Sequence, residues 1–323
     1  MTEFLLELYS EEIPPKLQIN ARTQLKQQLE TTLKNEGVHF KECLAYSSPT
    51  RLCLHIIGIP EKIKIKEKEV KGPKTGVSEN IIQGFIKSHN ISDKDLFKKE
   101  TEKGEFYFLK ISEKHILVEN LLIDVVPKTI STISWKKSMK WSTNNLIWGR
   151  PLRSIFALFN GKKLPFKLQH LDSTDIIIVE QDLVSKSRKV KSFKEYSSFL
   201  KENKIIFDQN ERQKIILKRF ISVSNSKNYK DRYNHYLLEE VVNIVENPHV
   251  LLVSFDKEYL KIPEEIIIST IEKHQKYFPL FDSRGKLTNH FFVVANKKDE
   301  KKLISEGNKR VVDARLADAK FFW

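Results

Sequence analysis

A pair of prolines near the start of the chain limits how its first forty residues can fold. Pro14-Pro15 cannot extend a strand or lie inside a helix, so the apolar run Phe4–Tyr9 before it predicts a short strand. The apolar residues after the prolines recur at every fourth position and are Leu17, Ala21, Leu25, Leu29 and Leu33. This spacing predicts a helix with one apolar face, which Gly37 ends. The chain therefore opens with a strand followed by a helix.

Short strand-like and helix-like segments then alternate along the chain. Residues 52–56 and 106–111 have strand character, while 116–134 has helical spacing interrupted at Pro127. In the last third, Asp208 and Glu211 form a capping box for a basic helix, and Asp282–Gly285 joins two strand candidates as a hairpin. The pattern predicts a multi-domain α+β fold of mixed sheets and packed helices.

The length of 323 residues favours more than one domain. A basic aromatic stretch at 135–141 marks a soft boundary, so we predict domains at 1–140 and 141–323. No run of eighteen apolar residues is present, and Glu3 and Glu7 interrupt the apolar start, which is unlike a signal peptide. We therefore expect a cytoplasmic protein without a membrane partner.

Cys43 and Cys53 fit neither a disulfide scaffold nor a zinc knuckle, so we expect packing roles for both.

The charge balance favours a polyanionic partner. Fifty-six Lys and Arg against forty-two Asp and Glu give a net charge of +14 and a pI near 9.4. Many of the lysines alternate with Glu and Ile, as in residues 63–70, where they would form an ordinary solvated face. Charge alone therefore leaves nucleic-acid binding and a solvated lysine surface as equal alternatives.

Candidate RNA contacts are basic residues next to aromatic ones. They are Lys136, Lys137 and Lys140 between Trp135 and Trp141, together with Arg150, Arg153 and Lys276. Lysines neutralise phosphates and aromatic faces stack on unpaired bases. For the two tryptophans we favour the alternative, in which they anchor the core and the lysines surround them. The two arginines could bind phosphates or pair with carboxylates within the fold.

Several motifs of catalysis are missing from the sequence. There is no Gly-rich loop followed by Lys-Ser or Lys-Thr, and no His-x-x-x-His pair. His55–Gly58 and Lys137–Lys140 only faintly match the ATP-binding signatures of class I aminoacyl-tRNA synthetases, and we set that interpretation aside. We predict no catalytic residue, no metal ligand and no cofactor bound by this chain.

A family resemblance rests on strings that occur in order over almost the whole chain. They are Leu6–Pro15, Ser48–Leu52, Lys71–Pro73, Met139–Trp141, Arg150-Pro151, Leu238–Val242, His274–Pro279, Phe292–Asn296, Gly307-Asn308 and Arg315–Phe322. Each string alone is weak, but their shared order is specific. In this respect the chain resembles the amino-terminal portion of the beta subunit of bacterial heterotetrameric glycyl-tRNA synthetase.

The resemblance implies a subunit of an alpha2beta2 glycine-tRNA ligase. The alpha subunit would hold the class II site for ATP, Mg and glycine, while the beta subunit, which lacks that site, engages tRNA(Gly) and is required for glycyl-tRNA aminoacylation. The implied partners are the alpha subunit, tRNA(Gly) and a second beta subunit. The second part would resemble the editing-type module of phenylalanyl-tRNA synthetase beta chains, with HD-type and anticodon-binding domains to follow. We therefore expect a fragment or a truncated gene product.

Two strings depart from the family pattern. Tyr9-Ser10 stands where the family has Gly-Thr, so a tight turn that Gly permits would be made differently. Residues 179–182 replace an expected Gly-His-Arg-Phe string with Val-Glu-Gln-Asp.

A stand-alone RNA-binding or assembly module without ligase activity is the alternative function. A hydrolytic editing domain is disfavoured, since no nucleophile, base or metal set is recognisable and glycine has no smaller rival to clear.

Overall fold

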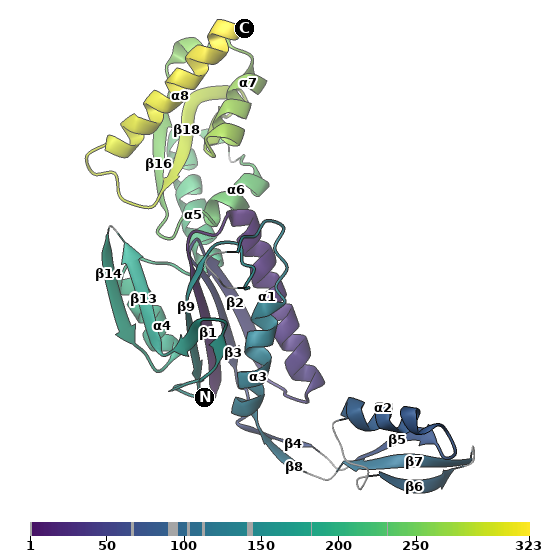
Figure 1. The fold of residues 1–323 in the computed structure, drawn as a ribbon. Coiled ribbons are helices and arrows are strands. Elements are labelled where there is room, and N and C mark those ends of the chain that lie inside the picture. The colour runs from purple at the N-terminus through teal and green to yellow at the C-terminus, as the bar shows by residue number, and fades with distance from the viewer. Residues whose placement is uncertain are drawn as a thin grey trace.

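The computed structural model describes residues 2–65, 68–89, 96–101, 104–111, 114–140, 145–181, 183–230 and 232–323. Figure 1 shows three bodies arranged along the molecule. A large sheet with its covering layers lies in the middle, and a smaller body of sheet and helices contains the carboxy terminus. A third, small body is joined to the middle one by the paired strands β4 (Lys62–Ile65) and β8 (Lys114–Leu117).

The middle body is built on a seven-stranded sheet. Its strand order is β11-β12-β9-β1-β3-β2, and β10 also pairs with β9. The bounds are β1 Glu3–Ser10, β2 Glu42–Ser48, β3 Arg51–Ile57, β9 Leu152–Phe159, β10 Lys162–Lys163, β11 Lys167–Leu168 and β12 Leu171–Thr174. All pairs are antiparallel except β12 with β9. The predicted opening strand is confirmed as β1.

Two helices cover one face of this sheet. These are α1 (Pro15–Asn35) and α3 (Val118–Ser131). The five predicted apolar residues of the first helix are all buried against the sheet, and Gly37 takes a positive φ of 80° just after the helix, as its C-terminal role requires. The predicted interruption at Pro127 is wrong, because α3 continues through it. The segment at 114–117 is not helical but forms a strand before α3.

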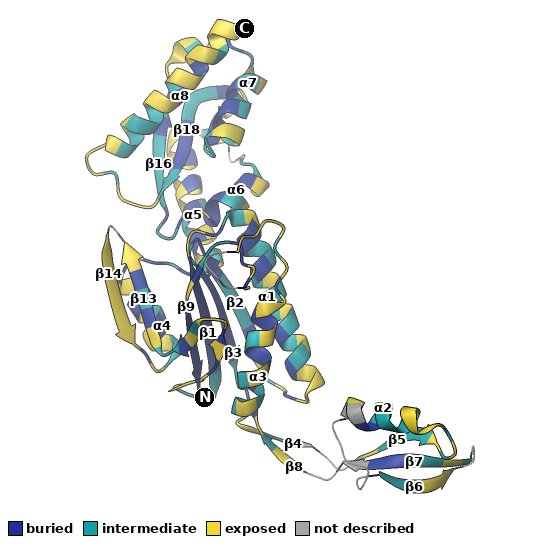
Figure 2. Ribbon diagram, in the orientation of Figure 1, coloured by how far each residue is buried: buried dark blue, intermediate teal, exposed yellow. Residues whose placement is uncertain are grey.

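A hairpin and a helix cover the opposite face. The hairpin consists of β13 (Ile176–Gln181) and β14 (Val184–Lys189), and it is followed by α4 (Phe193–Glu202). With layers on both sides, β1 is buried from Phe4 to Ser10 instead of showing one wet face. Figure 2 shows the same contrast, since the inner strands are dark blue while β14 is exposed along its length.

The carboxy-terminal body is a four-stranded sheet between helices. Its strand order is β15-β17-β18-β16, with α5 and α6 packed on one face and α7 and α8 on the other. The bounds are β15 Tyr229–Lys230, β16 His249–Ser254, β17 Phe278–Asp282, β18 Leu287–Ala295, α5 Gln209–Lys227, α6 His235–Val242, α7 Glu264–Ser269 and α8 Leu303–Phe322. A 3-10 turn spans Lys257–Lys261, and a π-helical turn, Thr270–His274, continues α7.

Local signals in this body agree with the structure. Asp208 caps α5, because its side chain accepts a hydrogen bond from the Asn210 backbone N–H at 2.8 Å. The predicted hairpin between β17 and β18 is confirmed, and the Asp282 carboxylate accepts from the backbone N–H groups of Arg284 and Lys286 inside the turn.

The small body contains a three-stranded antiparallel sheet. Its strands are β5 (Lys68–Lys74), β7 (Gly104–Ile111) and β6 (Leu96–Thr101) in that order, with α2 (Glu79–His89) beside them. The strands β4 (Lys62–Ile65) and β8 (Lys114–Leu117) pair and join this body to the middle one. The turn predicted at Lys103-Gly104 includes Lys103, which lies outside the described residues.

The predicted α+β class is confirmed. The predicted domains 1–140 and 141–323 stay a prediction, and the large sheet draws strands from both, because β9 lies between β1 and β12. Among the described residues, no helix is both long and apolar enough to cross a membrane.

A contact between two tryptophans fixes the segment that leads into β9. Trp148 is fully buried, its ring lies 4.7 Å from that of Trp135, and its indole N–H donates to the Ser10 hydroxyl at 3.1 Å. A Cβ added at Gly149 would come within 2.5 Å of the Trp135 ring, so glycine is required for this close approach.

We expect Gly149→Ala to lower the free energy of unfolding by about 1–3 kcal/mol, because the added methyl must displace a packed indole ring. Gly84→Ala in α2 is the matched control, because no atom lies within 4 Å of the added methyl and alanine favours a helix. Urea denaturation of both variants checks the difference. Equal stability of the Gly149→Ala variant and the parent chain would contradict the close packing of Gly149 on Trp135.

Candidate functional site

Four of the six predicted RNA contacts lie on one segment between α3 and β9. Lys136, Lys137 and Lys140 are exposed on it, while Arg150 is half-buried and donates to the Gly149 carbonyl at 3.2 Å. The core-anchor alternative is confirmed for Trp135, which packs against the main core. Trp141 lies outside the described residues. The three lysines are thus presented on a segment that the tryptophan contact holds in place.

The other two predicted contacts are engaged by carboxylates. The Arg153 guanidinium forks onto Glu180, with Nη2 3.1 Å from Oε1, and Lys276 Nζ lies 3.1 Å from Glu240. For Arg153 the structure therefore bears out the carboxylate alternative. Whether any of the six binds RNA stays a prediction.

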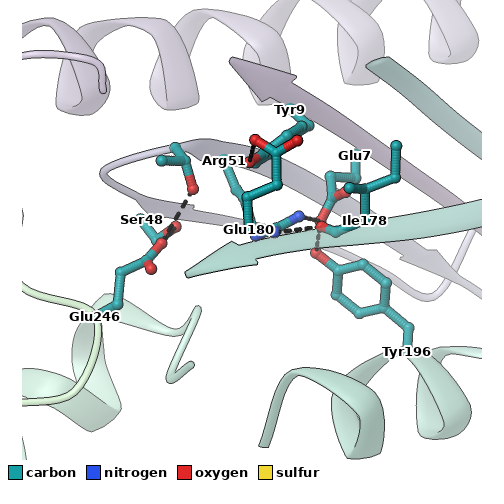
Figure 3. A network of polar contacts seen from close by, with 9 residues as sticks. Glu7, Tyr9, Ser48, Arg51, Ile178, Glu180, Tyr196 and Glu246 are labelled. Carbon is teal, nitrogen blue, oxygen red and sulfur yellow. Dashed lines mark hydrogen bonds and ion pairs between the residues drawn. The ribbon is translucent and has the colours of Figure 1, made fainter. Parts of the chain in front are cut away.

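A buried ion pair lies between the large sheet and the layer formed by the β13–β14 hairpin and α4. Arg51 on β3 donates to the Glu7 carboxylate on β1 at 2.8 Å, and the two side chains are only 1% and 2% exposed. Tyr196 on α4 donates to the same carboxylate at 2.6 Å, and Arg51 also donates to the Ile178 carbonyl on β13 at 2.5 Å. Figure 3 shows these groups pointing toward one another. The ion pair thus joins two neighbouring strands of the large sheet to both elements of the layer above it.

The network continues outward through Tyr9. Its ring lies under the Arg51 guanidinium at 4.5 Å and near that of Arg153 at 5.8 Å, and its hydroxyl donates to Glu180 at 3.1 Å. Tyr9 and Glu180, from the two strings that we expect to depart from the family pattern, therefore contact each other (Figure 3). Tyr9 and Ser10 make no tight turn; they extend β1, with a bulge opposite β9.

Hydrogen bonds also join this network to the carboxy-terminal body. Ser48, the last residue of β2, and Thr50, in the turn that follows it, both donate to Glu246, at 2.7 and 3.1 Å. The Asn296 side chain accepts from the backbone N–H groups of Glu246 and Asn247, at 2.8 and 3.2 Å. The position of the turn is thus coupled to the end of β18.

A buried arginine fixes the same junction. Arg212 on α5 is fully buried and donates to three backbone carbonyls, those of Ile206, Val242 and Ser47, at 2.6, 2.8 and 2.7 Å. No carboxylate among the described residues bonds it directly; its hydrogen bonds go to peptide carbonyls, and the nearby charges of Glu246 and Asp208 also favour its charged form. Burial lowers the pKa of Arg212 to about 10. This value is still well above 7, so the guanidinium is charged at neutral pH.

A cleft of about 1140 Å³ opens beside this junction. Charged groups of both signs line it, and they are Glu12, Glu180, Lys186, Glu202, Lys204, Glu246, Lys297, Lys298, Asp299, Glu300 and Lys301. His249 also reaches the cleft. The mixed signs mean that the cleft offers no uniform positive field for a polyanion.

The protonation states in and around the network are fixed near neutral pH. Burial raises the pKa of Tyr9 to about 12, and the pKa of Tyr196 is raised well above its ordinary value by burial and by the neighbouring charge of Glu7. Burial lowers the pKa of Arg51, but the neighbouring acidic groups, with Glu7 foremost and Tyr196 and Glu246 after it, together raise it above the ordinary value. The pKa of the buried Cys53 thiol is also raised by burial. These groups suit permanent hydrogen bonds and ion pairs better than proton transfer at pH 7.

Sequence reasoning missed this network, although a signal was present. Glu7 is the one charge between Phe4 and Tyr9, and Arg51 begins the next apolar strand, so two opposite charges lie in two strands that pair. Arg212 also continues the apolar face of its helix, four residues before Ile216 and eight before Phe220. A charge at an apolar position is the pattern that could have identified each of them.

The strings that carry the resemblance contact one another. The first meets the second through Glu7 and Arg51, and it meets Arg150-Pro151 where the Glu11 N–H donates to the Pro151 carbonyl at 3.0 Å. The string 274–279 meets 238–242 through Lys276 and Glu240. It also meets Gly307-Asn308, since Tyr277 donates to Asn308. Strings far apart in sequence thus form shared contacts in the fold.

Comparison with known proteins gives one consistent family. Residues 4–323 match the family model described as glycyl-tRNA synthetase beta subunit. Proteins named glycine–tRNA ligase beta subunit from Rickettsia canadensis (strain McKiel) and Rickettsia typhi (strain ATCC VR-144 / Wilmington) are 35% and 36% identical to the chain over 324 residues. These matches cover 100% of this chain but 48% and 49% of the two relatives, so the chain spans about half the length of the curated relatives it matches.

The buried ion pair should be much more costly to break than the exposed one beside it. We expect Arg51→Met to lower the free energy of unfolding by about 3–5 kcal/mol, because it leaves the Glu7 carboxylate buried without its cation. Arg153→Met, which removes an exposed partner of Glu180, should cost at most about 1 kcal/mol. Adding Glu7→Gln to Arg51→Met should recover part of the loss. Denaturant unfolding measures all three, and a double variant that is no more stable than Arg51→Met would contradict the coupling.

Stability near the cleft should fall on mild acidification. Burial, with Lys298 and Lys204 nearby, lowers the pKa of His249 below its ordinary value near 6.5. Below that value the unfolded chain binds a proton more readily than the folded one, so the contribution is present above about pH 6.5 and is lost as the pH falls through the folded pKa. We expect His249→Gln to lose less stability between pH 7 and 5 than the parent, measured by urea midpoints at both pH values. A larger loss in the variant would mean that folding raises the pKa of His249 instead of lowering it.

Proposed function

The chain belongs to the glycyl-tRNA synthetase beta subunit family, and from that premise we propose that it is the tRNA-engaging part of a glycine-tRNA ligase. The match over residues 4–323 is the observation that carries the proposal. In this role the chain, as a subunit, contributes to ATP-dependent attachment of glycine to tRNA(Gly). Its partners would be an alpha subunit, tRNA(Gly) and a second beta subunit in an alpha2beta2 assembly in the cytoplasm.

The proposed division of labour leaves the chemistry to the alpha subunit. ATP and Mg would bind there, and this chain would supply no catalytic residue, metal ligand or cofactor site. The buried network supports that division, because its tyrosines and arginines have pKa values far from neutrality and its contacts join layers of the fold. We also propose that the part after residue 140 resembles the editing-type module of phenylalanyl-tRNA synthetase beta chains in its fold.

The proposed RNA contacts start from the exposed lysines of one segment. Lys136, Lys137 and Lys140 are exposed, and none has a carboxylate partner among the described residues. Arg150 lies on the same segment and is half-buried. Arg153 and Lys276 would have to leave Glu180 and Glu240 to reach a phosphate, so we rank them behind the three lysines.

Replacing these three lysines by Gln should weaken binding of tRNA(Gly) and flatten its salt dependence. Each phosphate contact that is lost should reduce the slope of log affinity against log salt by roughly 0.7–0.9. Gln at Lys214, Lys218 and Lys227, three exposed lysines of α5, removes the same charge elsewhere and is the matched control. Equal effects of the two triple variants would mean that only net charge matters.

The ligase role needs a separate measurement. We expect the chain, mixed with its cognate alpha subunit, to support glycylation of tRNA(Gly) above the level of the alpha subunit alone. Binding of tRNA without any gain in glycylation would instead support the stand-alone RNA-binding module. Affinity for tRNA that does not change with salt would overturn the RNA-binding proposal itself.

A further inference from the structure

The sheet of the small body has two faces, and a helix covers one of them. In the antiparallel register Val70 pairs with Leu109, which puts these two residues on the same face as Tyr107. Gly72, in the bulge opposite Tyr107, faces α2, since a Cβ there would come within 3.0 Å of the Phe85 ring. The helix therefore covers the face that carries Val70, Tyr107 and Leu109.

The opposite face combines phenylalanine and lysine side chains. We call it the β5–β7–β6 open face, and its residues are Glu69, Lys71, Lys74, Phe97, Lys99, Phe106 and Phe108. Phe108 lies in the middle with Phe97 6.0 Å away, and both Phe97 and Phe106 remain partly exposed. Among the described elements, only α2 packs against this sheet, and it lies on the other side (Figures 1 and 2). Phe108 is itself buried, so Phe97 and Phe106 are the two rings left partly exposed on this face, which no described helix or strand covers.

Lysines lie over the rings of this face. Lys71 Nζ is 3.5 Å from the centroid of Phe106, and Lys99 Nζ is 5.6 Å from that of Phe108. Lys74 lies alongside Gly104 on the same face. Glu69, which pairs with Lys99, is the one acidic side chain described there. The face is therefore positive overall, and the Phe106 ring holds a flexible cation that another group could replace.

From these contacts we propose that the β5–β7–β6 open face binds a single-stranded segment of RNA. Unpaired bases would stack on Phe106 and Phe97, and Lys71, Lys74 and Lys99 would move onto the phosphates. Lys71 would leave the Phe106 ring as a base takes its place. A duplex does not fit this chemistry, because its base faces are already stacked on one another. The inference rests on the proposed function, which supplies tRNA as the RNA in question.

The test uses the 323-residue chain and a labelled single-stranded RNA of about eight nucleotides, within the range that such sites bind. Fluorescence anisotropy should show binding that Phe106→Leu weakens about tenfold, because leucine keeps apolar volume but cannot stack on a base. Tyr107→Leu removes a ring from the same strand on the helix-covered face and is the matched control. Equal losses in the two variants, or no binding by the parent chain, would overturn the proposal.

Exposed lysines give a second measurement that does not depend on the packing of a ring. Gln at Lys71 and Lys74 should flatten the salt dependence of binding to the single strand, while circular dichroism confirms an unchanged fold. Polyglutamate offers the same charge without bases. If it competes as well as RNA does, and Phe106→Leu leaves its binding unchanged, an acidic protein segment is the partner and the RNA assignment is overturned.

The two proposals fail in different ways. Loss of glycylation support with intact, Phe106-dependent binding of the single strand would overturn the ligase role alone. Binding of tRNA(Gly) that depends on Lys136, Lys137 and Lys140 but is insensitive to Phe106→Leu, together with no Phe106 effect on the single strand, would overturn the open-face assignment alone.

Discussion

The fold depends on a charge pair placed where neither charge can reach water. Glu7 and Arg51 lie on adjacent strands of the large sheet, and each is almost fully buried because layers cover both faces of that sheet. Isolated, either charge would be very costly in an apolar interior. Together with Tyr196 and the Ile178 carbonyl they satisfy each other, and the geometry they need fixes how the hairpin β13–β14 and α4 sit on the sheet.

The same strand pair connects the middle body to the carboxy-terminal one. Just before Arg51, at the junction of β2 and β3, the hydroxyl groups of Ser48 and Thr50 donate to Glu246. Arg212 donates to the carbonyl of the neighbouring Ser47. A shift of the turn between β2 and β3 would therefore disturb both the buried pair and the junction of the two bodies. Several of the strings that carry the family resemblance also contact one another, as the strings 274–279 and 238–242 do through Lys276 and Glu240. Strings that are far apart in the sequence therefore lie next to one another in the fold.

Charge in this protein divides into groups with different roles. Arg51, Arg153 and Arg212 are occupied within the fold, by carboxylates or by backbone carbonyls. The lysines of the segment before β9, and Lys71 and Lys74 of the β5–β7–β6 open face, are exposed without a carboxylate partner among the described residues, and it is these that can exchange water for phosphate at small cost. Lys99 of that face would first have to leave Glu69. The count of 56 Lys and Arg thus overstates the number of cations available to RNA, since several of them are held within the fold.

Sequence by itself determined the local structure and the family. Leucines at every fourth position specified α1, Asp208 specified the start of α5, and the residues 282–285 specified a hairpin, because each signal depends on neighbours in the chain. Tertiary structure alone decided that α3 would continue through Pro127, that Tyr9 would contact Glu180, and that β9 would join β1 across more than a hundred residues. It also decided which basic residues remain exposed. From the sequence, Lys136 and Arg153 are equally good candidates for a phosphate contact. Only the fold shows that Arg153 is paired with Glu180 while Lys136 is exposed, because the desolvation and pairing of a charge depend on groups distant in the chain.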